Sequence, residues 1–344
     1  MSLKFYFDHA QKLSFEHKEI VRDFDYYLSA IGITSTAIAL KDDLEISEQQ
    51  LASVGNFFTS YVEGIPLDYI LNESSFLDFT FYVDSRVLIP RPETELIVEK
   101  VIDFALNKNA NVLDVGTGSG CISISLAMLR PDLKILASDI SLDALDVATI
   151  NLQNHQVTNV LLVKSNWLAY AKTESVDLVI SNPPYLKPDD IHLGNLTHEP
   201  QSALVSPKGI KSFLEISHQA FIALKHGGRI IFEHGYSQRL EVTEILEDCG
   251  FKNIISESDL QGLYRFISFS YTHLRAHETV LLLVFPLLLA QNYISFSFFF
   301  FFLLFSSFFS FLSFFFSFFF FFFFFLLSFF FLLFSSFLFS FFFS

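Results

Sequence analysis

Hydrophobic positions in the first part of the chain recur at helical spacing. Between residues 1 and 72, Val21, Phe24, Tyr27, Leu28 and Ile31 predict one helix. Leu44 to Phe58 predicts a second helix with a less regular pattern, and Gly32 and Gly64 punctuate the segment. Since no cluster of catalytic side chains occurs there, the segment predicts a small helical bundle. It would serve either as structure alone or as a docking domain for a macromolecular substrate.

The spacing changes after residue 72. Apolar residues between 76 and 89 predict two short strands, a hairpin-like connector. Pro92 and the acidic residues that follow it favour a helix start, since Pro and carboxylates suit the first helical turn.

From Asn111 onward, strand patterns alternate with helix patterns. The alternation predicts a doubly wound, mostly parallel sheet, the α/β class, in which ligands bind at the carboxyl ends of the strands. Strands are predicted at 112–115, 134–139, 160–163, 176–180 and 228–233, with a closing pair at 251–256 and 264–269. Helices are predicted from Ile122 to Leu129 and from Ala144 to Leu152.

The end of the chain has a different composition. The protein has 344 residues, 47 of them Phe, and from Ser295 to Ser344 only Phe, Leu and Ser occur. Codons of T and C alone can encode all three, and Ser270 to Thr279 resembles a translated adapter sequence. We therefore expect residues 270–344 to be a translated nucleotide tract and exclude them from fold reasoning. The alternative is a membrane anchor, since the uncharged stretch exceeds the ~20 residues that span a bilayer, although no Lys/Arg cluster flanks it.

Charge and cysteine usage narrow the class of the remaining body. The tail contains one Arg and one Glu, so the net charge of −15 belongs to residues 1–270. An acidic body disfavours nucleic acid as the main partner. Cys121 and Cys249 lie far apart without metal-ligand spacing, so we expect neither a disulfide framework nor a metal site. The N-terminus is not a signal peptide, and we expect a cytoplasmic protein.

Asn182-Pro183-Pro184-Tyr185 directly follows the apolar run 176–180. Proline fixes φ and lacks the backbone donor, so the chain must turn where this strand ends. The turn presents one side-chain amide, backbone carbonyls and one aromatic ring. Such a set suits a planar group that both donates and accepts hydrogen bonds, namely an amide or an exocyclic amine. Taken alone, the motif is equally a tight turn after a core strand.

A glycine-rich loop follows the first strand of the predicted sheet. Gly116-Thr117-Gly118-Ser119-Gly120 lets the backbone approach a ligand closely, but Cys121 breaks the dinucleotide-binding fingerprint and disfavours NAD. Asp139 ends the second strand, where a carboxylate can accept both hydroxyls of a ribose. Its other interpretation is a helix N-cap. Loop, acid and Asn-Pro-Pro-Tyr thus follow three strands of one sheet.

This combination resembles the class I S-adenosylmethionine-dependent methyltransferases, and the flanking segments narrow it to the PrmC/HemK family, which methylates glutamine in peptide chain release factors. The resemblance covers about residues 15 to 269, with departures at Leu71-Asn72, where the family has a glycine, and at Asn166, where it has Asp. The segments that carry it are Gly64 to Ile70, Leu88 to Glu95, Glu199-Pro200 with Ala203-Leu204, and Glu233-His234-Gly235.

The resemblance implies a methyltransferase fold after a helical domain. The division would be 1–72 for substrate docking, 73–92 for the hairpin, 93–269 for the methyltransferase domain and 270–344 for the tail. It implies S-adenosyl-L-methionine bound by Gly116, Thr117, Gly118, Ser119, Gly120, Asp139, Trp167 and Asn182, with Trp167 beside adenine or otherwise in the core. Asn182, Pro183, Pro184 and Tyr185 would hold the glutamine of a Gly-Gly-Gln loop.

The implied activity is N5-methylation of that glutamine, which supports translation termination. The implied partner is a release factor, bound by a monomer, with no nucleic acid and with no membrane unless the tail is genuine. Three alternatives stay open: a glutamine methyltransferase of a ribosomal protein, a nucleic-acid adenine N6-methyltransferase, and a silent adaptor with a methyltransferase-like fold.

Overall fold

A computed structural model describes residues 3–33, 47–259 and 261–270, all within one compact unit, Met1–His273. The helices are α1 (Leu3–Leu13), α2 (Ile20–Ala30), α4 (Glu48–Val62), α5 (Leu67–Leu71), α6 (Pro92–Asp103), α7 (Cys121–Leu129), α8 (Leu142–Asn154), α9 (Gln201–Leu204), α10 (Lys211–Ala223) and α11 (Arg239–Asp248), with 3-10 turns η1 (Ile191–Asn195) and η2 (Pro207–Gly209). The strands are β1 (Ser74–Phe76), β2 (Phe79–Phe81), β3 (Asn111–Val115), β4 (Lys134–Asp139), β5 (Val160–Lys164), β6 (Val176–Ser181), β7 (Leu224–Glu233), β8 (Lys252–Ser258) and β9 (Tyr264–Ser270).

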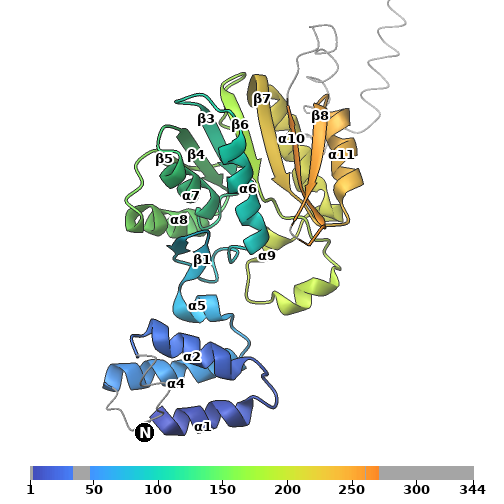
Figure 1. Ribbon diagram of the computed structural model, residues 1–344. Coiled ribbons are helices and arrows are strands. Elements are labelled where there is room, and N and C mark those ends of the chain that lie inside the picture. Colours follow the sequence, from blue (N-terminus) through green and yellow to red (C-terminus); the bar gives the residue numbers. More distant parts are fainter. Residues whose placement is uncertain (1–2, 34–46, 260, 271–344) are drawn as a thin grey trace, which may run out of the picture. The chain divides into compact units, whose positions relative to one another are not determined.

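The main sheet, drawn in green to orange in Figure 1, has the strand order β5-β4-β3-β6-β7-β9-β8 among the described residues. β5, β4, β3, β6 and β7 run parallel, whereas β9 is antiparallel to both β7 and β8. The chain reverses the order of its strands between β3 and β6, and such a switch point opens a crevice at the carboxyl ends of the strands. The predicted α/β sheet with its closing strand pair is confirmed.

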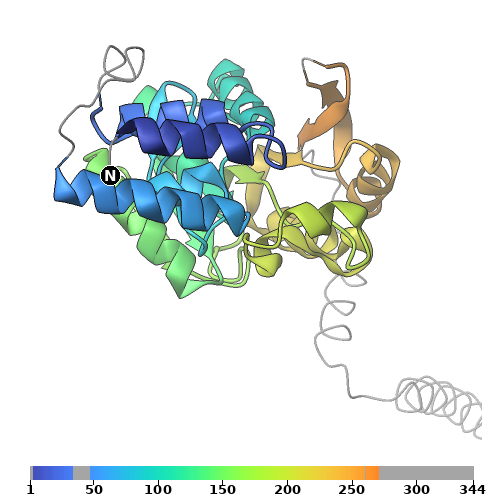
Figure 2. The same ribbon diagram turned by 90° about the horizontal axis from the view of Figure 1, so that it is seen from below.

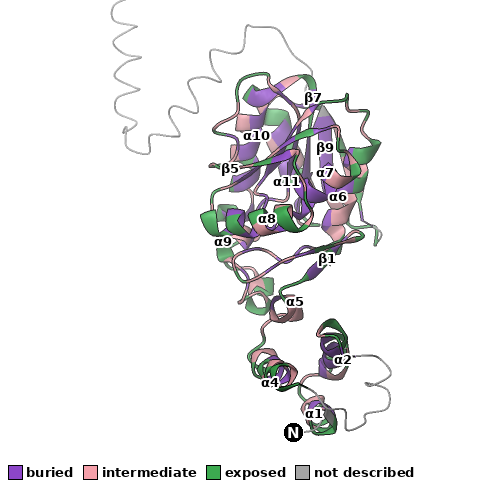
Figure 3. Ribbon diagram, turned by 90° about the vertical axis from the view of Figure 1, so that its left-hand side faces the viewer, coloured by how far each residue is buried: buried purple, intermediate pink, exposed green. Residues whose placement is uncertain are grey.

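Two apolar cores lie on opposite faces of this sheet, because neighbouring residues of a strand point to opposite sides. On β3, Val112 packs with α6 and α7, while Leu113 and Val115 pack with α10 and α11. The central strands β3 and β6 are accordingly buried on both faces along most of their length, and purple dominates the middle of the sheet (Figure 3). Burial on both faces explains why the parallel strands read as continuous apolar runs in the sequence.

The N-terminal helices α1, α2 and α4 pack side by side around a core of their own (Figures 1 and 2). Phe24, Leu28 and Phe57 are fully buried there, and the Tyr61 hydroxyl donates a 2.6 Å hydrogen bond to Asp23 Oδ2. α2 and α4 match the predicted helical spacing, and the predicted start at Leu44 to Ile46 lies outside the described residues. The glycines that punctuate this segment, Gly32 and Gly64, have positive φ after these helices. Its role in docking, like the domain boundaries, stays a prediction.

The connector differs from its prediction. β1 and β2 form the expected antiparallel pair, but they end at Phe81, and residues 83–89 form no strand. Val83 and Val87 are apolar because they pack in a loop against Tyr69, whose hydroxyl donates to the Val87 carbonyl. Asn72 occupies the position where the family has glycine. It has a left-handed φ of 54° after α5, a conformation that Asn tolerates better than most residues.

The helices α9, α10 and α11 were not among the predicted elements. The predicted tail, 270–344, lies outside the described residues except for Ser270. No helix within the described ranges is long and apolar enough to cross a membrane.

Candidate functional site

The glycine loop connects β3 to α7 and lines a pocket at the carboxyl edge of the sheet. Gly116, Gly118 and Gly120 all have positive φ, between 55° and 82°, a region that L-residues with a Cβ rarely enter. No described atom lies within 4 Å of the place where a Cβ of Gly118 would be. The loop therefore presents bare backbone to the pocket.

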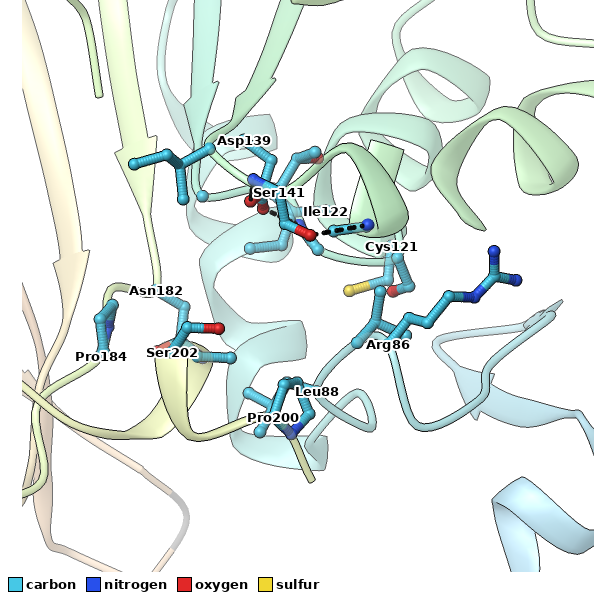
Figure 4. A pocket seen from close by; sticks show the side chains of 18 of the residues that line it. Arg86, Leu88, Cys121, Ile122, Asp139, Ser141, Asn182, Pro184, Pro200 and Ser202 are labelled. Atoms are coloured by element: carbon cyan, nitrogen blue, oxygen red, sulfur yellow. Dashed lines mark hydrogen bonds between the residues drawn. The ribbon is translucent and has the colours of Figure 1, made fainter. Parts of the chain in front are cut away.

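Asp139 is the last residue of β4 and holds this loop in place. Its Oδ2 accepts the Gly118 N–H at 3.0 Å, and its Oδ1 accepts the Ser141 N–H at 2.9 Å. Burial raises the pKa of this carboxyl, although the backbone donors act against that rise. Figure 4 shows Asp139 and Ser141 together at one side of the pocket. Asp139 is thus both a lining residue and a brace, and Ser141, two residues later, is the actual N-cap of α8.

Asp114 stands behind the loop and faces the core. It is 1% exposed, its Oδ2 accepts the Thr117 hydroxyl at 2.6 Å, and burial raises its pKa to about 6. Among the described residues, none forms a hydrogen bond with its Oδ1. The Asp114 carboxylate therefore holds Thr117 in place from the core side, and Asp114 itself does not line the pocket.

Asn182-Pro183-Pro184-Tyr185 leaves the end of β6 beside the glycine loop. The Ser181 hydroxyl, directly before it, donates a 2.6 Å hydrogen bond to the Val115 carbonyl and ties β6 to β3. Asn182 and Pro184 line the same pocket as Asp139 (Figure 4), whereas Tyr185 lines a second cavity. Asn182, Leu88, Arg91 and Ala203 belong to both cavities. Asn182 therefore lies at the boundary between the two.

The side chains of this motif are held from behind by buried groups. Asn182 Nδ2 donates to Thr94 Oγ1 at 3.1 Å, and the Thr94 hydroxyl donates to Glu233 Oε2 at 2.6 Å. The Tyr185 hydroxyl donates a longer bond of 3.4 Å to Glu233 Oε1. Gln238 Nε2 donates to the backbone carbonyl of Tyr185 at 3.0 Å. Both polar side chains of the motif are thus connected to the buried Glu233 carboxylate, Tyr185 directly and Asn182 through Thr94.

Trp167 also lines the pocket and has a left-handed φ of 53°. Its ring lies 3.7 Å from the Cβ position of Gly116, and its Nε1 donates a 2.8 Å hydrogen bond to Glu215 on α10. The indole is thus half-buried, with one part packed in the core and another lining the pocket. The core interpretation of Trp167 is thus confirmed in part, whereas its contact with adenine stays a prediction.

An ion pair joins two segments at the pocket mouth. Arg91 precedes α6, Glu199 precedes α9, and the two side chains form a salt bridge. Glu199 is 5% exposed and also accepts the Ile89 N–H at 3.1 Å. The pair fastens the connector to the loop that carries Pro200 and Ala203, which line the pocket.

The structure brings most of the predicted site residues together. Gly116, Thr117, Gly118, Ser119, Asp139, Trp167, Asn182 and Pro184 line the first cavity and Tyr185 the second, while Gly120 and Pro183 line neither. Sequence reasoning gave no role to Thr94, Glu233, Gln238 or Glu215. The first two lie in segments already singled out by the family resemblance, which was the available signal.

Known proteins resemble the chain in sequence and in fold. The family described as "Methyltransferase small domain" matches residues 92–200. A release factor glutamine methyltransferase of Flavobacterium psychrophilum is 34% identical over 267 residues, covering 75% of this chain and 94% of that protein. The protein of the same name from Coxiella burnetii is 32% identical over 227 residues, covering 65% and 82%.

Among solved structures, the release-factor-specific protein-(glutamine-N5) methyltransferase of Alicyclobacillus acidocaldarius is 27% identical. It covers 56% of this chain and 100% of its own, with a TM-score of 0.35. The chain belongs to the release factor glutamine methyltransferase family.

Proposed function

We propose that this protein transfers a methyl group from S-adenosyl-L-methionine to the side-chain nitrogen of the glutamine in the Gly-Gly-Gln loop of a peptide chain release factor, and so supports translation termination. The position of Asn182 at the boundary of two cavities carries the proposal. One cavity has the lining of a nucleoside site, and the other opens beside Tyr185. An amide at that boundary meets a methyl donor on one side and an amide substrate on the other.

The first cavity fits the cofactor. Because Gly118 has no side chain, the cofactor can approach the loop backbone closely. The Asp139 carboxylate lines the same pocket and could accept hydrogen bonds from ribose hydroxyls. Ile140 is 61% exposed and lines the same pocket, and Trp167 supplies an aromatic wall. These apolar groups suit adenine. When bound there, S-adenosyl-L-methionine supplies an electrophilic methyl group on positively charged sulfur.

The chain's own residues orient the substrate amide. A glutamine amide nitrogen is a poor nucleophile because its lone pair is delocalised into the carbonyl, so positioning has to supply several kcal/mol. In our proposal Asn182 Oδ1 and the Pro183 carbonyl accept its two N–H groups, and Tyr185 packs on its face. The same carbonyl dipoles stabilise positive charge developing on nitrogen. No general base is assigned, since the proton can leave after methyl transfer.

Labelled S-adenosyl-L-methionine tests the proposal directly. The full chain and a version ending at Ser270 are incubated separately with release factor, ribosomal protein and DNA. We expect label in the release factor, lost when its Gly-Gly-Gln glutamine is replaced by Glu. Label in the ribosomal protein or in DNA alone would instead support one of the two alternatives.

An Asn182→Ala variant separates catalysis from a silent adaptor. Removal of the amide should abolish methylation while cofactor binding weakens only slightly, and near-normal turnover would contradict the assignment.

We further propose that the enzyme acts in the cytoplasm as a monomer, without nucleic acid as partner.

A further inference from the structure

A directional series of hydrogen bonds links Asn182 to the buried end of β7. Asn182 Nδ2 donates to Thr94 Oγ1 at 3.1 Å, and Thr94 donates to Glu233 Oε2 at 2.6 Å. Thr94 is 3% exposed and Glu233 2% exposed, so solvent has little access to compete for these bonds. Which group donates and which accepts at each step of this series depends on its last residue, Glu233.

Threonine has one hydroxyl proton, and an ionised carboxylate can only accept. Because the Thr94 hydroxyl donates its hydrogen bond to Glu233, Thr94 Oγ1 can offer only its lone pairs to Asn182. The side of Asn182 that faces Thr94 must therefore be the NH₂ group. A flipped amide would place Oδ1 against Oγ1 with no proton between two acceptors. The unflipped amide leaves Oδ1 for the pocket lining to which Asn182 belongs.

We propose that Thr94 and Glu233 are positioning residues that fix the orientation of the Asn182 amide, so that an acceptor oxygen is presented to the glutamine side chain. This inference rests on the proposed function and deepens it. A flipped Asn182 would present two donors to a substrate amide that must itself donate. The orientation of one amide thus decides whether the substrate nitrogen is held.

Glu233 is suited to this task because of its surroundings. The Tyr185 hydroxyl donates to its other oxygen, Oε1, at 3.4 Å. The carboxylate of Glu233 therefore supports Tyr185 directly and Asn182 through Thr94. Burial raises its pKa to about 7, the Thr94 and Tyr185 hydrogen bonds and the charge of Arg265 on β9 lower it, and Glu93 on α6 raises it. The buried thiol of Cys121 on α7 also faces it, with a pKa raised to about 12 by burial.

Thr94→Val tests the relay, with Thr94→Ser as its matched control. Valine keeps the shape of threonine but removes the hydroxyl, whereas serine keeps the hydroxyl and loses a methyl group. For Thr94→Val we expect kcat to fall about tenfold to a hundredfold, with the Kd for S-adenosyl-L-methionine changed less than about twofold. Serine should restore most of kcat.

The result that overturns the proposal is specific. If Thr94→Val keeps the wild-type kcat, or loses cofactor affinity in step with kcat, or is not rescued by serine, Thr94 does not orient the amide. If the wild-type protein binds cofactor but methylates no glutamine, the proposed function has failed instead.

Glu233→Gln supplies a second readout that a purely structural role would not change. Below a pKa near 7, a protonated Glu233 can donate a hydrogen bond to Thr94. The Thr94 hydroxyl can then turn its own hydrogen towards Asn182, so the fixed direction is lost. The kcat of the wild type should therefore fall as pH decreases through about 7, and Glu233→Gln, which cannot titrate, should remove this inflection. An unchanged inflection in the Gln variant would contradict the relay.

Discussion

Gly120→Ala is the substitution whose cost the structure defines best. Gly120 ends the glycine loop directly before α7 and has φ +82°. An added Cβ would lie 2.9 Å from Ile124 Cδ1 and 3.4 Å from Ala148 Cβ, and both neighbours are fully buried. The variant therefore combines backbone strain with overpacking. It acts on folding without touching either cavity lining.

The two contributions can be estimated separately. A left-handed conformation costs an L-residue about 1 kcal/mol. Overpacking of a closed core adds about 1–3 kcal/mol, because Ile124 has to leave its rotamer. We expect the free energy of unfolding to fall by about 2–4 kcal/mol, a large part of the stability of an ordinary domain.

Urea unfolding of the cofactor-free protein measures this change, with Gly118→Ala as the control. Gly118 lies in the same loop with φ +55°, and no described atom lies within 4 Å of its Cβ position. It should therefore lose only the backbone contribution, about 1 kcal/mol. If the two variants unfold at the same urea concentration, the overpacking argument is refuted.

Two further substitutions test the polar groups of the site. In Asp139→Asn the amide can accept only one of the Gly118 and Ser141 N–H groups and turns its NH₂ against the other. We expect titration calorimetry to show about tenfold to hundredfold weaker cofactor binding. Wild-type affinity would refute the role of Asp139 in holding the glycine loop. Arg91→Met leaves the buried Glu199 carboxylate without its cation; since the Arg91 side chain is 33% exposed, we expect about 2 kcal/mol lost in urea unfolding, partly recovered when Glu199→Gln is added. No recovery would show that the ion pair is not the cause.

Much of the fold could be predicted because its pattern is local. β4 was predicted with its observed bounds, since the apolar run Ile135-Leu136-Ala137 indicates a strand and Asp139 marks its end. α10 was missed because its buried face includes Ser212, Ser217 and Ala220, which a search for large apolar residues passes over. Their spacing, with Phe213, is nevertheless helical.

The supporting groups of the site could not be predicted in this way. Thr94 and Glu233 lie 139 residues apart and meet only because α6 packs against the sheet beside β7. A pattern of neighbouring residues cannot indicate a contact between residues so far apart in the sequence. Lining residues such as Asp139 and Asn182 lie at strand ends and were accessible to sequence reasoning, whereas the pairing of Thr94 with Glu233 was not.

The division of the site at Asn182 has a consequence for how such an enzyme changes over evolutionary time. Beyond the residues that both cavities share, the second cavity is lined by Arg265 on β9 and by the segments that follow β6 and β7, including Lys187, His192 and Tyr236. The glycine loop, Asp139 and Trp167 belong to the first cavity alone. If the proposed function holds, we expect mutations in the second set to change which amide-bearing protein is methylated with little effect on methyl-donor binding. Substrate choice and methyl-donor binding could then change separately.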